Sequence, residues 1–259
     1  MKLLYLVRLD SAIRHEGLVE VLRRHIDAGR GSALKIWEVD EAPQFGFMEW
    51  CAARQLQYCF TADSDPAFHR TAWSNRMVLR TPEQVIAICH ADVYVPDAQV
   101  AEAARAIERG EKYVAAFGDE TDQWGLMRAN EKYLRHMQAD GDPAAILTDD
   151  TLLDFPFKRR LGSYSGMVFL DREFYVAAGM DNEKIIGWGP EEVERHIRLT
   201  RLGSGYRRIA GWCAHMPHDG AYSQVEQRER NSREFQRIHC ITREMMLQEV
   251  ARWKEYRGY

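Results

Sequence analysis

Three short stretches of the sequence carry side chains that can bind a metal ion or move a proton. In the first, "AICHADVYVP", a run of apolar residues ends and His90 and Asp92 follow two positions apart. A carboxylate is a hard oxygen ligand, and a neutral imidazole suits manganese or zinc. An aspartate at a turn can also serve only to fix the next loop. We therefore treat His90 and Asp92 as candidates for a metal site.

The second stretch, "GWGPEEV", predicts a helix that begins with two glutamates. A Gly-Pro pair is a favourable helix entry, and the helix dipole favours ionised Glu191 and Glu192 in the first turn. Such a carboxylate can act as a general base, although it can also merely complement the dipole. Consecutive helix positions lie about 100° apart, so we expect the two glutamates to point differently. Trp188, beside Gly189, would offer a flat wall for a sugar ring.

The third stretch, "GWCAHMPHDG", places His215 and His218 three positions apart in a loop after a short strand. Two imidazoles at this spacing can bind one metal ion. Loop histidines are also commonly just solvated. The pair is therefore a further candidate for a metal site.

An alternation of strands and helices must position these residues. Over the first 115 residues, this alternation favours a parallel, doubly wound sheet, in which ligands bind beyond the carboxyl ends of the strands. Asp40, His90 and Asp92 stand at such ends, and Asp97 is placed to cap a helix. The strands are expected at 3–7, 33–40, 56–63 and 85–92, and the helices at 17–29 and 97–110.

The second half of the chain is less regular. Residues 118–160 are rich in charged and turn residues and predict a long excursion with a short helix, of the kind that often shapes a binding face. Residues 165–179 predict a strand and a helix. Apolar residues at helical spacing predict one helix over 231–258. Its arginines would allow contact with an anionic membrane or a second copy, but we favour packing on the domain.

Composition bounds the class of protein. The chain has 259 residues, of which 46% are hydrophobic and 29% charged, as in a globular protein. The net charge of -4 argues against binding duplex DNA over a whole face. Five cysteines without a C-x-x-C pair favour a reducing compartment. The first apolar run is too short for a signal peptide or a membrane span, so we expect a cytoplasmic protein.

The order of the three stretches resembles the metal-dependent GT-A glycosyltransferases. The likeness is to the family-2, chondroitin-polymerase-like enzymes, the β-1,4-galactosyltransferases and the polypeptide GalNAc-transferases. "FHRTAWSNRM" also resembles the Arg-Asn segment before the Asp-x-Asp strand, with Asn75 and Arg76 in that place. The resemblance covers roughly residues 3–220. It implies one GT-A domain, an α/β fold with a Rossmann-like mixed sheet flanked by helices.

Within that domain, the resemblance implies a division of labour. Residues 1–115 would form the nucleotide-sugar half, 116–230 the acceptor and metal half, and 231–259 a C-terminal helix. Asp92 would bind the metal that bridges the donor diphosphate. His218, five residues after Cys213, would be a second ligand. The remaining ligand would be His215, where the galactosyltransferases have a methionine.

The resemblance also implies donor and acceptor contacts. Asp40 would contact the nucleotide base, and Asn75, Arg76 and His90 would help to bind the donor. Trp188, Gly189 and Glu191 would hold the acceptor, and Glu192 would be the base. Two positions depart from the family. His90 replaces the first Asp of Asp-x-Asp, and Glu192 stands where inverting members have Asp and retaining GalNAc-transferases have Asn.

The function implied is transfer of a sugar from a nucleotide sugar, with UDP favoured, to an acceptor hydroxyl. Mn²⁺ or Mg²⁺ would be the cofactor, and the configuration would be inverted. A retaining transferase and a degenerate homologue that only binds a nucleotide sugar remain alternatives. A sugar-phosphate nucleotidyltransferase is disfavoured, because "VRLDSAIRHEG" after the first strand contains no glycine-rich phosphate loop.

Overall fold

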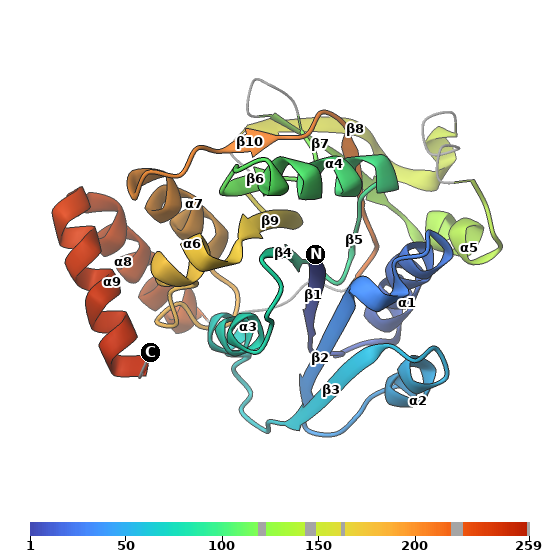
Figure 1. Ribbon diagram of the computed structural model, residues 1–259. Coiled ribbons are helices and arrows are strands. Elements are labelled where there is room, and N and C mark those ends of the chain that lie inside the picture. Colours follow the sequence, from blue (N-terminus) through green and yellow to red (C-terminus); the bar gives the residue numbers. More distant parts are fainter. Residues whose placement is uncertain (119–122, 143–148, 162–163, 219–224, 258–259) are drawn as a thin grey trace.

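A mixed seven-stranded sheet forms the centre of the molecule (Figure 1). The computed structural model describes residues 1–118, 123–142, 149–161, 164–218 and 225–257. One strand, over residues 167–171, runs antiparallel to both of its neighbours, and the other paired strands are parallel. The strands, in spatial order, are β10 (Arg207–Arg208), β6 (Tyr113–Ala115), β9 (Met167–Asp171), β4 (Val85–Cys89), β1 (Lys2–Val7), β2 (Leu34–Asp40) and β3 (Gln57–Ala62).

Helices cover both faces of this sheet. Successive side chains of β1 point to opposite faces and therefore enter two separate cores. Leu3 and Tyr5 pack in one core and Leu4 in the other. The buried central strands are therefore almost continuously apolar, as expected for strands covered on both faces. The first core takes side chains from α1 (Ala12–Asp27), α2 (Phe47–Ala52) and α4 (Asp97–Glu108), and the second from α3 (Arg70–Leu79), α6 (Arg172–Ala177) and α7 (Glu191–Arg201).

Two helix starts differ from the sequence prediction. The first helix begins at Ala12 rather than near residue 17, because the side chain of Ser11 caps it by accepting a hydrogen bond from the Arg14 N–H. Asp97 is the first residue of α4 and not its side-chain cap, and its carboxylate forms an ion pair with Arg30 instead.

The region predicted as an excursion contributes to a second sheet. Four strands form it, in the order β5 (Val93–Tyr94), β11 (Trp212–His215), β7 (Gln123–Ala129) and β8 (Leu153–Leu161). The predicted short helix is present as α5 (Glu131–Gln138), but the prediction missed both strands. Strand β7 pairs with β8 on one side and with β11, more than eighty residues away along the chain, on the other. No local sequence pattern predicts such a distant pairing. Two short 3₁₀ helices, Gly31–Ala33 and Asp150–Leu152, complete the described elements.

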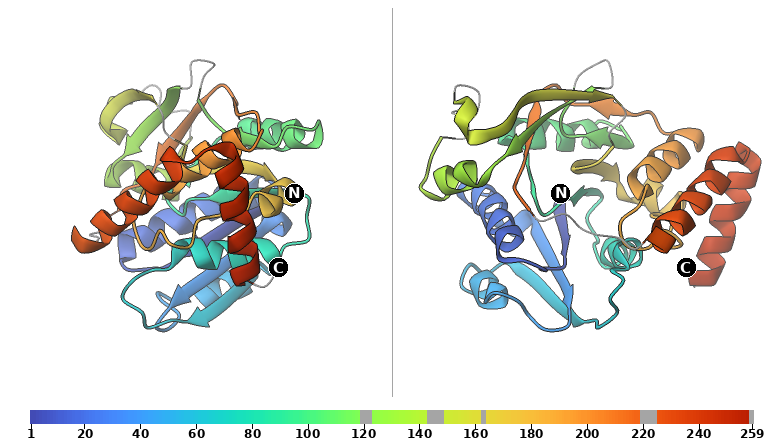
Figure 2. Two further views of the ribbon diagram at one scale, coloured as in Figure 1. Left: turned by 90° about the vertical axis from the view of Figure 1, so that its left-hand side faces the viewer. Right: turned by 180° about the vertical axis from the view of Figure 1, so that it is seen from behind.

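The predicted single C-terminal helix is instead a hairpin of α8 (Val225–Cys240) and α9 (Arg243–Arg257). Thr242 breaks the helix and caps α9, since its hydroxyl accepts a hydrogen bond from the Met245 N–H. The hairpin lies against the outer side of α7 (Figures 1 and 2). It buries a small core of its own, formed by Ile238, Met246, Val250 and Trp253.

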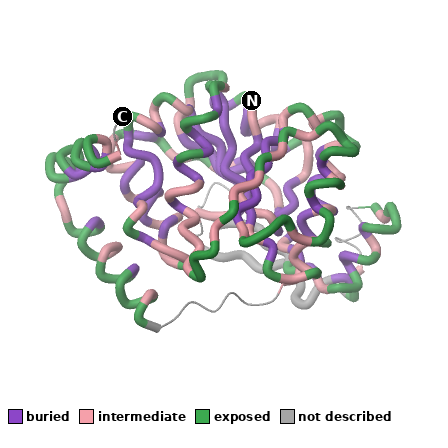
Figure 3. Tube along the Cα trace, turned by 90° about the horizontal axis from the view of Figure 1, so that it is seen from below, coloured by how far each residue is buried: buried purple, intermediate pink, exposed green. Residues whose placement is uncertain are grey.

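Burial follows this arrangement. Buried residues gather along the central strands, whereas α8 and α9 keep long exposed faces (Figure 3). Among the described residues, no helix is long and apolar enough to cross a membrane.

Candidate active site

A short β ladder brings Asp92 beside the two histidines. Strand β5 follows Asp92 directly and pairs antiparallel with β11, so that Val93 lies opposite His215. The main-chain oxygen of Asp92 also accepts a hydrogen bond from the Met216 N–H at 2.7 Å. As a result, Asp92 Oδ2 lies 3.3 Å from Nε2 of His218 and 3.9 Å from Nε2 of His215.

This cluster has the donor set of a divalent-cation site. One ligand atom from each of the three residues can be chosen so that all lie within 4.8 Å of one another. Although burial opposes it, the neighbouring imidazoles lower the pKa of the Asp92 carboxyl, so this group is ionised. Burial lowers the pKa of His215, which leaves its imidazole neutral. An ionised carboxylate and a neutral imidazole are the forms that bind metal ions.

Arg14 is a neighbour of this cluster that the sequence prediction missed. Its Nη1 lies 3.8 Å from Asp92 Oδ2, and its Nη2 lies 3.4 Å from Nδ1 of His218. Helix α1 can approach so closely because residue 17 is glycine: a Cβ on Gly17 would lie 3.1 Å from the side chain of Met216. The sequence signal for this placement was Ser11, a favourable N-cap residue that lets the helix begin early enough to include Arg14.

A second cluster gathers around Arg70, the first residue of α3. Its guanidinium contacts Glu191 Oε1 at 2.6 Å, His90 Nε2 at 2.8 Å and Glu192 Oε1 at 3.5 Å. His90 also contacts Glu192 directly. The two glutamates therefore contact different nitrogens of one arginine. Arg70 was missed too, although it lies within "FHRTAWSNRM".

His90 Nε2 has two partners with opposite requirements. Arg70 can only donate a hydrogen bond, so it needs a lone pair on this nitrogen, whereas the carboxylate of Glu192 needs a proton there. The two contacts therefore compete.

The two glutamates have different pKa values. Burial raises the pKa of Glu191 to about 7, with Arg70 offsetting only part of the effect. For Glu192, burial is outweighed by the contacts with His90 and Arg70, and its pKa lies well below the usual range. Neighbouring carboxylates resist carrying two charges together. Near neutral pH, Glu192 is thus ionised and Glu191 titrates.

Asn75 and Arg76 do not join these clusters. Asn75 is buried, and its amide bonds the main-chain N–H and carbonyl of Asp181 at 2.8 and 2.9 Å. Asp181 in turn pairs with Arg195 of α7 at 2.7 Å, so Asn75 supports the segment before that helix. The guanidinium of Arg76 lies 4.4 Å above the ring of Trp73. Both residues lie more than a turn beyond Arg70 on α3.

Asp40 stands where the ends of β1, β2 and β3 meet. Its carboxylate accepts hydrogen bonds from the main-chain N–H groups of Leu9 at 3.1 Å and Glu41 at 2.9 Å. Its main-chain oxygen accepts one from the Asp63 N–H at 2.9 Å. The side chain remains partly accessible. Its contact with a nucleotide base stays a prediction.

Trp188 and Gly189 lie in the loop before α7, which packs on α8. Trp188 is 61% exposed, and the guanidinium of Arg228 lies 5.5 Å from its ring. A Cβ on Gly189 would lie 2.7 Å from Asn231 Nδ2 and 2.8 Å from Ile185, so a larger residue would push the loop off α8. Asn231 also donates a hydrogen bond to the Trp188 carbonyl at 3.0 Å.

Comparison with known proteins shows the fold. No family model and no curated protein matches the chain. The solved structure of GalNAc-T7 with UDP, GalNAc and Mn²⁺ matches with a TM-score of 0.60 and 11% identity, covering 99% of this chain and 54% of that one. S. aureus TarS in complex with UDP-GlcNAc matches with a TM-score of 0.58 and 9% identity, over 98% and 72%.

A third match is the mannosyltransferase PcManGT from Pyrobaculum calidifontis in complex with GDP-Man and Mn²⁺. Its TM-score is 0.51 and its identity 10%, covering 99% of this chain and 75% of that one. The chain thus spans about half the length of GalNAc-T7 and about three quarters of the other two. The predicted GT-A fold, with its mixed sheet flanked by helices, is confirmed.

Proposed function

We propose that this chain is a metal-dependent glycosyltransferase that uses a nucleotide-diphosphate sugar. The observation that carries the proposal is the pairing of two clusters at one edge of a GT-A sheet. One contains Asp92 and two histidines, and the other contains Glu191 and Glu192. His90 connects the two clusters, because it precedes Asp92 by two residues and its side chain contacts Glu192. Support also comes from the GT-A neighbours solved with UDP or GDP-Man and Mn²⁺.

On the donor side, Asp92, His215 and His218 would hold the cation. Two imidazoles among three ligands favour Mn²⁺ over Mg²⁺, which prefers oxygen ligands. When bound, the cation would neutralise the charge on the leaving diphosphate. Arg14, which neighbours Asp92 and His218, would donate charge-assisted hydrogen bonds to the same phosphate oxygens. Asp40 would contact the base.

On the acceptor side, Glu192 would take the proton of the acceptor hydroxyl. That oxygen would attack the anomeric carbon while the bond to the diphosphate breaks on the opposite face, so the configuration inverts. Arg70 would hold Glu191 and Glu192 in place, and Trp188 would stack on the acceptor sugar. A retaining mechanism and a binding role without catalysis are the alternatives.

Thermal unfolding with UDP and with GDP, each with and without Mn²⁺, tests the proposal. A ligand that binds only the folded state stabilises it by mass action. We expect one of the nucleotides and Mn²⁺ together to raise the melting temperature more than the sum of their separate effects. If neither nucleotide changes the melting temperature in the presence of Mn²⁺, the proposal fails.

A further inference from the structure

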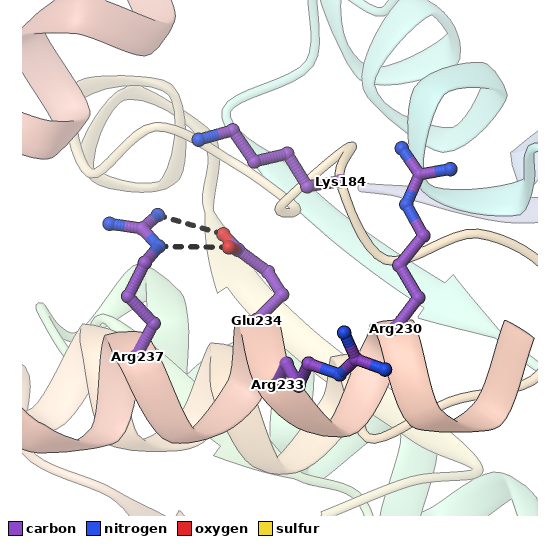
Figure 4. A pocket seen from close by; sticks show the side chains of 5 residues that line it. All are labelled: Lys184, Arg230, Arg233, Glu234 and Arg237. Carbon is purple, nitrogen blue, oxygen red and sulfur yellow. Dashed lines mark hydrogen bonds and ion pairs between the residues drawn. The ribbon is translucent and has the colours of Figure 1, made fainter. Parts of the chain in front are cut away.

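A pocket with an entirely charged lining lies between α8 and the segment that leads to Trp188. Its volume is about 410 Å³. Figure 4 shows the Arg237–Glu234 pair at one end of the pocket, Arg230 and Arg233 at the other, and Lys184 across from the helix. The lining residues are Lys184, Arg230, Arg233, Glu234 and Arg237.

Two of the four cations in this pocket already have carboxylate partners. Arg237 bonds Glu234 at 2.8 and 2.9 Å and Glu249 at 2.6 Å, and Lys184 lies 3.3 Å from Glu249. Although burial opposes it, hydrogen bonds from Arg237 lower the pKa of Glu249 to about 2. Both carboxylates are therefore ionised, and they balance Arg237 and Lys184.

The other two cations have no buried carboxylate partner among the described residues. Arg230 makes no hydrogen bond or ion pair with any residue that the structure describes. Arg233 pairs with Glu229 at 3.2 Å, but the two side chains are 78% and 62% exposed, and such a surface pair contributes little. Two guanidinium groups are thus available at this end of the pocket. Each offers a planar fork of donors that matches phosphate oxygens.

The pocket adjoins the predicted acceptor surface. Lys184 belongs to the same segment as Trp188, four residues earlier. Asn231, next to Arg230 on α8, bonds the main-chain groups of Ile186 and Trp188 at 2.8–3.1 Å. The loop that carries Trp188 therefore packs on the same turn of α8 as Arg230.

We propose that this pocket binds a phosphate group carried by the acceptor, while the acceptor's sugar ring stacks on Trp188. The two available guanidinium groups match the two charges of a phosphate monoester. This inference rests on the proposed transferase function only in naming the bound phosphorylated sugar as the acceptor. The binding of a phosphorylated sugar requires neither donor nor metal.

A nuclear magnetic resonance titration of the ¹⁵N-labelled full chain, without metal or donor, tests the site. The probes are glucose 6-phosphate, glucose and inorganic phosphate, and the signals are the Nε–H groups of Arg230 and Arg233 and the indole N–H of Trp188. We expect glucose 6-phosphate to shift all three signals and to bind at least tenfold more tightly than glucose. Inorganic phosphate should shift the arginine signals alone.

The double variant Arg230→Gln with Arg233→Gln should weaken binding of glucose 6-phosphate at least tenfold. The matched control is Arg243→Gln, at the exposed start of α9 and outside the pocket, which should leave binding unchanged. Unchanged binding in the double variant would overturn the site. Arginine shifts without any response of Trp188 would overturn the link to the acceptor. Failure of the nucleotide and Mn²⁺ test would leave these results standing, so the two proposals can fail separately.

Discussion

The two clusters at the edge of the sheet contain the same kinds of group but balance their charges differently. In the first, the single carboxylate of Asp92 faces two imidazoles and Arg14 at distances of 3.3–3.9 Å. In the second, Glu191 contacts Arg70 at 2.6 Å, and the same guanidinium reaches Glu192. We call the first the spaced cluster, because its side chains lie 3.3–3.9 Å from the Asp92 carboxylate. We call the second the closed cluster, because Arg70 contacts its partners at 2.6–3.5 Å.

This difference indicates different chemistry. Ligand atoms that face one another across 3–5 Å leave room for a cation between them, so the first cluster is suited to bind a metal ion. Contacts at hydrogen-bond distance already neutralise the second cluster, and its titrating groups can hold or release a proton. We infer that the first cluster handles the donor's charge and the second the acceptor's proton.

The largest expected effect comes from removing the one carboxylate of the spaced cluster. Asp92→Ala leaves two imidazoles, so affinity for Mn²⁺ in the presence of UDP should fall by more than the roughly 10–100-fold typical of losing a supporting group. Isothermal titration calorimetry measures this loss. Asp27→Ala is the control, because Asp27 is an exposed carboxylate at the far end of α1 and pairs only weakly with Arg23 at 3.6 Å. Tight Mn²⁺ binding by a folded Asp92→Ala variant would contradict the assignment.

In the closed cluster, Glu192→Gln should lower turnover by about two to four powers of ten, the range for a lost general base. The donor would lie on the metal side, so the affinity for UDP should change little. Glu191→Gln is the matched comparison and should mainly weaken acceptor binding, seen as a raised KM. A nearly active Glu192→Gln enzyme, together with a retained anomeric configuration in the product, would favour the retaining alternative.

The raised pKa of Glu191 predicts how stability depends on pH. The unfolded chain releases this proton near the ordinary glutamate pKa of about 4.3, whereas the folded chain keeps it to about pH 7. The folded state then binds more protons in between, so this contribution is complete below the unfolded pKa and is lost as pH rises through 7. Urea unfolding from pH 5 to 8.5 should show a flatter profile for Glu191→Gln. Parallel profiles for the two proteins would refute the shift.

Arg14 should have the smallest effect, since it only neighbours the spaced cluster. Its charge opposes a cation beside Asp92, so Arg14→Gln should tighten binding of Mn²⁺ alone by about fivefold, near 1 kcal/mol. The same change should weaken binding of UDP with Mn²⁺, because a phosphate partner is lost. Calorimetry with Mn²⁺ alone and with UDP separates the two effects. Equal changes of the same sign in both titrations would exclude this role.

The sequence could predict the elements that have local patterns. The strands that end at Asp40 and before His90, and the helix that begins with Glu191, lie close to where the apolar periods and the Gly-Pro pair predicted them. The edge of the sheet that collects these residues follows from the parallel order. These features depend on residues close together in the chain, so local composition and the spacing of apolar residues predict them.

Contacts between distant segments could not be predicted in the same way. Whether α3 presents Arg70 or Arg76 to the site depends on the rotation of the helix against the sheet, which the sequence pattern leaves open. The approach of Arg14 depends on contact between α1 and the segment before His218. The role of each predicted site residue therefore stays a prediction until it is measured.

The most direct test of the account is cleavage of nucleotide sugars by the purified protein. A panel of UDP-sugars and GDP-mannose would be incubated with Mn²⁺ or with EDTA, and release of the nucleoside diphosphate would be measured for the wild-type protein and for Asp92→Ala. We predict release from at least one donor in Mn²⁺, and loss of that release in EDTA and in the variant. Release from no donor, or release that survives both EDTA and Asp92→Ala, would contradict the account.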